Sequence, residues 1–223
     1  MTKPHMFNRT TGFIIVAALA AGLGLLASKA FFSGRDDGTQ PAMQTVKLFP
    51  QPRALPAFAL RQSDGTQLAL GELAGHWTVV FLGFTHCPDI CPTTLAELAQ
   101  AQKRWAALPD STRPRVLFVS VDPDRDTPMK TGEYARAFHR DTLAATADVP
   151  ALESFAKSMS MVFVRVPSEA GEPEAGTPAD RYSVDHSASL AVLDPQGRMA
   201  GVITPPLLPK AIADDLIVLT SAR

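Results

Sequence analysis

Two cysteines carry the most distinctive chemistry of this chain of 223 residues. Cys87 and Cys91 lie in the segment GFTHCPDICPTTL at residues 83–95, and the chain has no other cysteine. Thiolates are the nucleophiles of disulfide exchange and are also soft ligands for Cu(I) or Zn(II). The pair is spaced as C-x-x-x-C, one residue more than a redox C-x-x-C motif. The pattern indicates a disulfide catalyst, a metal site or a structural bridge, and leaves all three open.

The elements around the cysteines place them where α/β folds carry out chemistry. Residues 78–84, TVVFLGF, form the continuous apolar run that is typical of a strand buried on both faces, and residues 93–108 predict a helix. The cysteines therefore lie at the carboxyl end of a strand and near a helix N-terminus, where the helix dipole favours a thiolate. A disulfide across so small a loop would constrain the unfolded chain little, so a purely structural bridge is the least favoured of the three alternatives.

Two thiolates make an incomplete metal site, and the five histidines of the chain are the candidates for a third ligand. His186 lies in YSVDHS at residues 182–187, just before a predicted strand at 189–193. In a thioredoxin-like fold, the loop at that position faces the cysteine loop. Asp185 beside it could orient the loop or support a ligating imidazole.

The other four histidines are weaker candidates. His5 lies on the far side of a predicted membrane segment, and His76 is expected to be a surface or cap residue. His139 lies near the end of a predicted helix, where histidine usually has a capping role. His86 could lower the pKa of the adjacent thiol of Cys87, but adjacent side chains rarely chelate one ion well.

The order of predicted elements indicates an α/β thioredoxin-like fold, a central mixed sheet flanked by helices. Asp64-Gly65 predicts a hairpin turn, and Thr127-Pro128 predicts a helix start. The other predicted elements are a second buried strand at 115–121, helices at 127–140, 149–159 and 208–219, a strand at 161–166, an exposed loop at 168–180, and strands at 189–193 and 199–203 that pair antiparallel.

The N-terminus predicts a membrane anchor. Residues 10–28 carry no charge over 19 positions, about the length that crosses a bilayer, and Lys3 and Arg9 precede them without an acidic residue. A cleaved signal peptide is the alternative, since Ser28-Lys29-Ala30 resembles a cleavage site, but the lysine and the length favour an uncleaved anchor. We therefore expect a single-pass protein of the bacterial inner membrane whose folded domain faces the periplasm.

The predicted organisation has four parts: a cytoplasmic N-terminus at 1–10, the transmembrane anchor at 11–32, a tether at 33–55 and the thioredoxin-like domain at 56–223. The domain has ample apolar content, with 46% hydrophobic residues in the whole chain. Basic and acidic residues nearly balance, 21 against 22, so nothing indicates a nucleic-acid partner.

Three motifs together resemble the Sco (SenC) family of copper-binding proteins. They are GFTHCPDICP at 83–92, VSVDPDRDTP at 119–128, and YSVDHS at 182–187 with LDPQG following at 193–197. Their order and spacing match the family over roughly residues 55–220. The resemblance implies a thioredoxin-like domain that binds one copper ion, Cu(I) or Cu(II), through Cys87, Cys91 and His186.

The resemblance also implies a function and partners. The family is membrane-anchored and assists assembly of the dinuclear copper A centre of cytochrome c oxidase subunit II, so the expected partners are apo subunit II and other periplasmic copper carriers. A copper metallochaperone is favoured over an enzyme. The alternatives are a thiol–disulfide oxidoreductase, in which Cys87 and Cys91 act as a redox pair that keeps the oxidase cysteines reduced, and a redox sensor.

Overall fold

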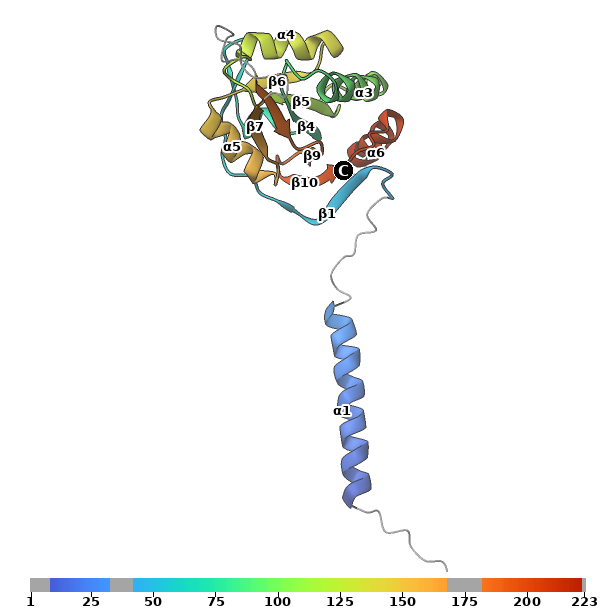
Figure 1. The fold of residues 1–223 in the computed structure, drawn as a ribbon. Helices are drawn as coiled ribbons and strands as arrows, with labels where there is room; N and C mark the ends of the chain where they lie inside the picture. Colours follow the sequence, from blue (N-terminus) through green and yellow to red (C-terminus); the bar gives the residue numbers. More distant parts are fainter. Residues whose placement is uncertain (1–8, 33–41, 168–181, 222–223) are drawn as a thin grey trace, which may run out of the picture. The chain divides into compact units, whose positions relative to one another are not determined.

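The computed structural model describes residues 9–32, 42–167 and 182–221. They belong to two units: helix α1 (Arg9–Phe32) lies in the first and all other elements lie in the second (Figure 1). In this described part of the chain, no helix has both the length and the apolar character needed to cross a bilayer. The anchor expected at 11–32 is therefore not confirmed and stays a prediction.

The second unit is built on an eight-stranded mixed sheet, which confirms the expected sheet type. The strand β4 (Thr78–Gly83) lies near its centre, parallel to β5 (Arg115–Ser120), which is parallel to β6 (Leu143–Thr146). All other pairings are antiparallel. The remaining strands are β9 (Leu190–Leu193), β10 (Met199–Ile203) and β1 (Val46–Arg53) on one side of this group, and β2 (Leu60–Gln62) and β3 (Gln67–Leu68) on the other.

Helices cover the sheet, so its central strands are buried. All six residues of β4 are buried, as its unbroken apolar run predicts. The helices α3 (Ile90–Trp105) and α6 (Pro209–Ser221) pack side by side, where the indole of Trp105 donates a 3.2 Å hydrogen bond to the Ala213 carbonyl (Figure 1). The other helices are the short α2 (Leu70–Leu73), α4 (Pro128–Phe138) and α5 (Val149–Ser158).

Local sequence signals fix several element boundaries. The hydroxyl of Thr127 accepts a hydrogen bond from the Lys130 amide, and Pro128 opens α4, as predicted. The Asp64-Gly65 turn joins β2 to β3, and Gly65 has a φ of +83°, which glycine adopts without strain. These signals explain why the hairpin and α4 lie where the sequence places them.

A separate two-stranded sheet carries His186. It pairs β7 (Phe163–Pro167) with β8 (Tyr182–His186), and Phe163 lies opposite His186. The sequence placed His186 in a loop, whereas it is the last residue of β8. The loop expected at 168–180 lies outside the described residues.

The segment 33–55, interpreted as a tether, differs from expectation in its second half. There, β1 pairs antiparallel with β10 in the main sheet. Its start is held by Asp215 of α6, which accepts hydrogen bonds of 2.7–3.1 Å from the amides of Gln44, Thr45 and Val46 and from the Thr45 hydroxyl. Residues 33–41 lie outside the described part.

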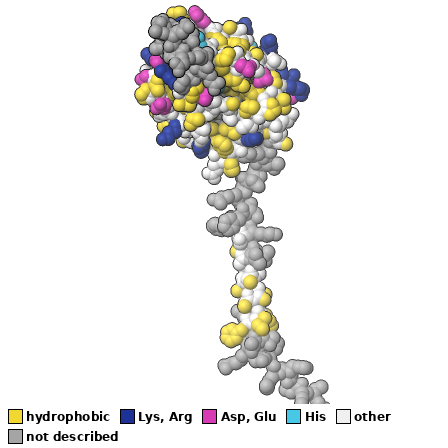
Figure 2. Space-filling view, in the orientation of Figure 1, with side chains coloured by type: hydrophobic (Ala, Val, Ile, Leu, Met, Phe, Trp, Pro, Cys, Tyr) yellow, Lys and Arg dark blue, Asp and Glu magenta, His cyan; other side chains and the backbone are white. Residues whose placement is uncertain are grey.

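The face of the second unit seen in Figure 2 carries charges of both signs. Figure 2 shows Lys and Arg side chains interspersed with Asp and Glu on the visible face, in keeping with 21 basic and 22 acidic residues in the chain. That face therefore presents no large basic surface of the kind that binds nucleic acid.

Candidate metal centre

The cysteine loop joins β4 to α3. Asp89 is the N-cap of α3 and Cys91 is its second residue, so the helix starts close to where the sequence predicts it. Cys91 is fully buried and Cys87 is 9% exposed. Both are free thiols, and the Cys91 amide donates a 3.4 Å hydrogen bond to Cys87 Sγ. The first turn of the helix therefore holds the two sulfurs near each other.

A glycine makes room for the buried sulfur. A Cβ atom at Gly83, the last residue of β4, would lie 2.9 Å from Cys91 Sγ and 2.9 Å from Cε2 of Phe118. Real Cβ atoms do not approach neighbours so closely, so any other residue would push the sulfur or the ring aside. Gly83 thus allows Cys91 to sit directly on the end of the central strand.

His186 approaches the cysteines from β8. Its Nε2 lies 3.3 Å from Cys91 Sγ, and its Nδ1 lies 3.2 Å from the carbonyl oxygen of Ser187. A carbonyl only accepts, so this hydrogen bond places the proton on Nδ1 and leaves the Nε2 lone pair facing the sulfur. The imidazole packs edge-on against Phe81 and Phe84, with centroid distances of 5.7 and 6.2 Å.

The three predicted site residues therefore come together. Cys87 Sγ, Cys91 Sγ and one imidazole nitrogen of His186 all lie within 4.8 Å of one another. Burial lowers the pKa of His186, which keeps the imidazole neutral and able to act as a ligand. Two sulfurs and one imidazole nitrogen form a soft donor set that suits Cu(I), Cu(II) or Zn(II).

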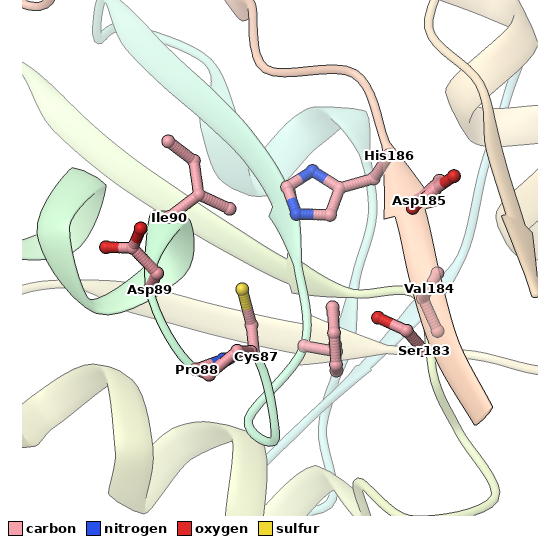
Figure 3. A pocket seen from close by; sticks show the side chains of 9 residues that line it. Cys87, Pro88, Asp89, Ile90, Ser183, Val184, Asp185 and His186 are labelled. Carbon is pink, nitrogen blue, oxygen red and sulfur yellow. The ribbon is translucent and has the colours of Figure 1, made fainter. Parts of the chain in front are cut away.

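A groove of about 320 Å³ opens onto two of these donors. Cys87 and His186 line this groove and face each other across it (Figure 3). Phe84 and Ile90 also line it. Cys91 does not line this groove. An ion bound to the three donors would therefore be reached from the side of Cys87 and His186.

Burial reverses one expectation about the thiols. The helix N-terminus predicts a stabilised thiolate, but burial raises the pKa of the Cys91 thiol well above its usual value. The hydrogen bond from the Phe84 backbone opposes this rise and is the smaller effect. Without a metal, Cys91 is a neutral thiol at pH 7, and it must lose a proton to become a ligand.

The support of His186 also differs from expectation. Asp185 was expected to orient the loop or the imidazole. Its side chain instead extends away from the ring of His186 (Figure 3), whose Nδ1 is bonded to the Ser187 carbonyl. A backbone carbonyl is one of the usual partners of the second ring nitrogen of a metal-ligating histidine.

The other histidines that the structure describes do not belong to this donor set. His86 is exposed and turns toward Asp126, with 3.5 Å between Nδ1 and Oδ1. His139 is the C-cap residue of α4, as expected. His76 is not the surface or cap residue that was expected: it is 8% exposed and its Nδ1 lies 2.9 Å from the Arg113 carbonyl oxygen. His5 lies outside the described residues.

Two carboxylates of the motif at 119–128, Asp122 and Asp126, are fully buried beside the site. Asp126 accepts hydrogen bonds from the Thr85 amide (2.7 Å), the Thr85 hydroxyl (2.5 Å) and the Ser120 hydroxyl (2.6 Å). Asp122 accepts from the Tyr182 hydroxyl (2.5 Å) and from Nε of Arg125. One ligand atom from each of His86, Asp122 and Asp126 lies within 4.8 Å of the others. The Asp126 oxygens are already engaged by Thr85 of the cysteine loop and by Ser120, and those of Asp122 by Tyr182 and Arg125.

The fold and these donors define an α/β protein of the thioredoxin-like class, with a soft-metal donor set at the end of its central strand. The SCO1/SenC family model matches residues 48–221, and the chain belongs to that family, which confirms the resemblance seen in its motifs. The motifs at 83–92, 119–128 and 182–187 all lie inside the matched region.

Known proteins resemble this chain over most of its length. A protein of Stutzerimonas stutzeri that is named as copper-binding is 32% identical over 204 residues, which cover 91% of each chain. The structure of Arabidopsis thaliana ScoI with copper bound is similar with a TM-score of 0.65 and 27% identity, over 76% of this chain and 99% of that one. The structure of apo Sco1 of Thermus thermophilus is similar with a TM-score of 0.67 and 29% identity, over 80% of this chain and 99% of that one.

Proposed function

We propose that this chain is a copper metallochaperone that carries one copper ion on Cys87, Cys91 and His186. The observation that carries the proposal is the convergence of two free thiols and one imidazole nitrogen within 4.8 Å. Copper is chosen over zinc because the similar ScoI structures of Arabidopsis thaliana and Bradyrhizobium japonicum have copper bound. Two thiolates and one imidazole suit Cu(I) and also hold Cu(II).

Each donor has its own part in loading and release. Cys91 is buried in the core and fixes the ion to the end of β4, whereas Cys87 and His186 face the groove. Ligands of a partner would therefore meet the ion from the groove and replace Cys87 and His186 before Cys91. The proposed recipient is apo cytochrome c oxidase subunit II, at its copper A centre, and other periplasmic copper carriers are the proposed donors.

A thiol–disulfide oxidoreductase is the second candidate, supported by the Cys91 amide bonded to Cys87 Sγ at 3.4 Å. In that reaction, the two thiols form a disulfide and pass two electrons and two protons to a disulfide of the acceptor, which becomes a dithiol. A redox sensor would use the same sulfur pair. Disulfide formation would also remove two copper donors, which couples the two activities.

The location belongs to the proposal as well. We place the chain in the bacterial inner membrane by a single anchor at 11–32, with the folded domain in the periplasm. Support comes from the 19 uncharged residues at 10–28 and from Lys3 and Arg9 before them.

Anaerobic copper titration of the purified full-length chain tests the proposed site. The wild type should take up one Cu(I) in competition with a chromophoric chelator, and the Cu(II) form should show sulfur-to-copper charge-transfer absorption. That absorption should be lost or strongly reduced in Cys87→Ala and Cys91→Ala. Equal affinities of the wild type and both variants would exclude the site.

A transfer experiment separates the two candidates. The copper-loaded chain is mixed with the apo dithiol form of the copper domain of oxidase subunit II, and the reduced, copper-free chain is mixed with the disulfide form of the same domain. A chaperone loads the dithiol form, whereas an oxidoreductase converts the disulfide form to the dithiol without copper. Copper binding without either reaction would contradict both roles.

A further inference from the structure

The copper donors are carried by two different sheets. Cys87 and Cys91 follow β4 of the eight-stranded sheet, and His186 ends β8 of the two-stranded sheet. Among the described residues, no backbone ladder joins β8 to the larger sheet. The amide and the hydroxyl of Ser187, just after His186, bond to Val162, the residue before β7. Side chains must therefore hold this hairpin against the cysteine loop.

Arg125 makes the contacts that join the two parts. Its Nη1 donates a 3.0 Å hydrogen bond to the carbonyl oxygen of Tyr182, the first residue of β8. Its Cζ lies 3.8 Å from the centroid of the Tyr182 ring and 5.6 Å from that of Phe84, which follows β4. With the Arg125 side chain only 16% exposed, these cation–π contacts are largely shielded from water and stronger than on an open surface.

Tyr182 is held from further directions. Its hydroxyl donates a 2.5 Å hydrogen bond to Asp122, the same buried carboxylate that accepts from Nε of Arg125. A second guanidinium, that of Arg165 on β7, lies 4.9 Å from the ring centroid and pairs with Asp124 at 2.6 Å. The start of β8 is thus tied to the segment that follows β5.

Phe84 completes the connection to the metal donors. Its ring contacts Arg125 on one side and stands edge-on to the imidazole of His186, at 84° and 6.2 Å between centroids. Arg125 itself does not belong to the group of donor atoms. Apart from its charge, which lysine would keep, Arg125 can affect the ion through Tyr182, Phe84 and the strand that carries His186.

We propose that Arg125 is a positioning residue for the copper site: it fixes the β7–β8 hairpin against Phe84 and so places His186 Nε2 beside the cysteine sulfurs. The proposal rests on the proposed function, because it assumes that copper is bound by Cys87, Cys91 and His186. An ordinary structural role, in which Arg125 only neutralises Asp122, would affect folding but not the way His186 meets the ion.

The test uses Arg125→Lys in the full-length chain. Lysine keeps a positive charge beside Asp122 but lacks the planar group that reaches the Tyr182 carbonyl and both rings. We expect Cu(I) affinity to fall by about tenfold, as for other groups that orient metal ligands, and the Cu(II) charge-transfer spectrum to shift toward that of His186→Ala. Arg198→Lys is the matched control, because Arg198 Nε donates to the buried Asp194 in a turn away from the site; it should keep wild-type affinity and spectrum.

A double variant shows whether the effect passes through His186. When Arg125→Lys is added to His186→Ala, affinity should change by less than about twofold. Tyr182→Leu tests the same contact from its other side, because it leaves Arg125 and Asp122 in place, and it should lower affinity and shift the spectrum in the same way. Wild-type affinity and spectrum in Arg125→Lys or Tyr182→Leu, or an undiminished loss in the His186→Ala background, would overturn the proposal. Equal copper affinity of the wild type and His186→Ala would instead refute the proposed function.

Discussion

Cys91 Sγ lies 3.3 Å from His186 Nε2, although 95 positions separate the two residues in the chain. The imidazole thus faces the more buried of the two sulfurs. Cys87 lines the groove, so the two thiols differ in how easily a reagent or a partner reaches them.

Alkylation should reveal this difference. In the reduced, metal-free protein we expect iodoacetamide to modify Cys87 well before Cys91. Cys91 is fully buried, and burial raises its pKa, so little of the reactive thiolate is present. Peptide mapping by mass spectrometry over time measures both rates. Cys87→Ser should retain only the slow reaction, and copper should protect both sulfurs; equal rates would contradict the assigned burial.

The two histidines nearest the cysteines should behave differently. His186→Ala removes a proposed donor, and we expect Cu(I) affinity to fall by at least about tenfold. His86→Ala should bind copper as the wild type does, although His86 adjoins Cys87, because its imidazole faces Asp126. Competition titration measures both. A greater loss of copper affinity in His86→Ala than in His186→Ala would show that His186 is not the nitrogen donor.

Gly83→Ala should disturb stability and copper binding together. The new Cβ would lie 2.9 Å from Cys91 Sγ and from a ring carbon of Phe118, and overpacking of this kind costs about 1–3 kcal/mol. Urea unfolding should show the loss, and copper titration should show weaker binding because the sulfur must move. Gly71→Ala is the control, since a Cβ there meets nothing within 4 Å. A Gly83→Ala protein as stable as the wild type would mean that the sulfur has more room than the structure gives it.

Two buried carboxylates allow stability to be separated from copper binding. Asp126→Ala and Asp215→Ala each remove the acceptor of several hydrogen bonds, and each should lower the free energy of unfolding by about 2–4 kcal/mol. Only Asp126 holds Thr85 in the cysteine loop, so only Asp126→Ala should weaken copper binding, by about tenfold. Denaturant unfolding and copper titration of the same samples provide the two readouts. A similar loss of affinity in Asp215→Ala would show that instability alone weakens the site.

Strong local signals made the centre of the fold predictable. The apolar run at 78–84 identified β4 because a strand covered on both faces needs no polar residues. Thr127-Pro128 identified the start of α4, and the three spaced motifs identified the family. In each case, a short continuous segment of the sequence is enough to predict the feature.

Elements that depend on distant partners were missed. β1 is paired with β10 and anchored by Asp215, about 170 positions away, so its own residues read as a tether. The strand character of Tyr182–His186 comes from pairing with β7 and is not evident in YSVDH itself. His76 is buried against expectation, and Asp126 is fully buried although carboxylates are mostly exposed. The groups that satisfy them, the Arg113 carbonyl and Thr85, are brought to them only by the fold.

The close fit of Cys91 against Gly83 and Phe118 makes one of the proposed copper donors a core side chain as well. Ion binding and folding then share a thermodynamic cycle, because an ion that binds only the folded chain adds its binding free energy to the stability of the whole domain. When the ion is released, the free energy of unfolding of the domain falls by the same amount. If the domain delivers its ion as proposed, the empty domain that leaves the partner should be easier to unfold than the loaded domain that arrived.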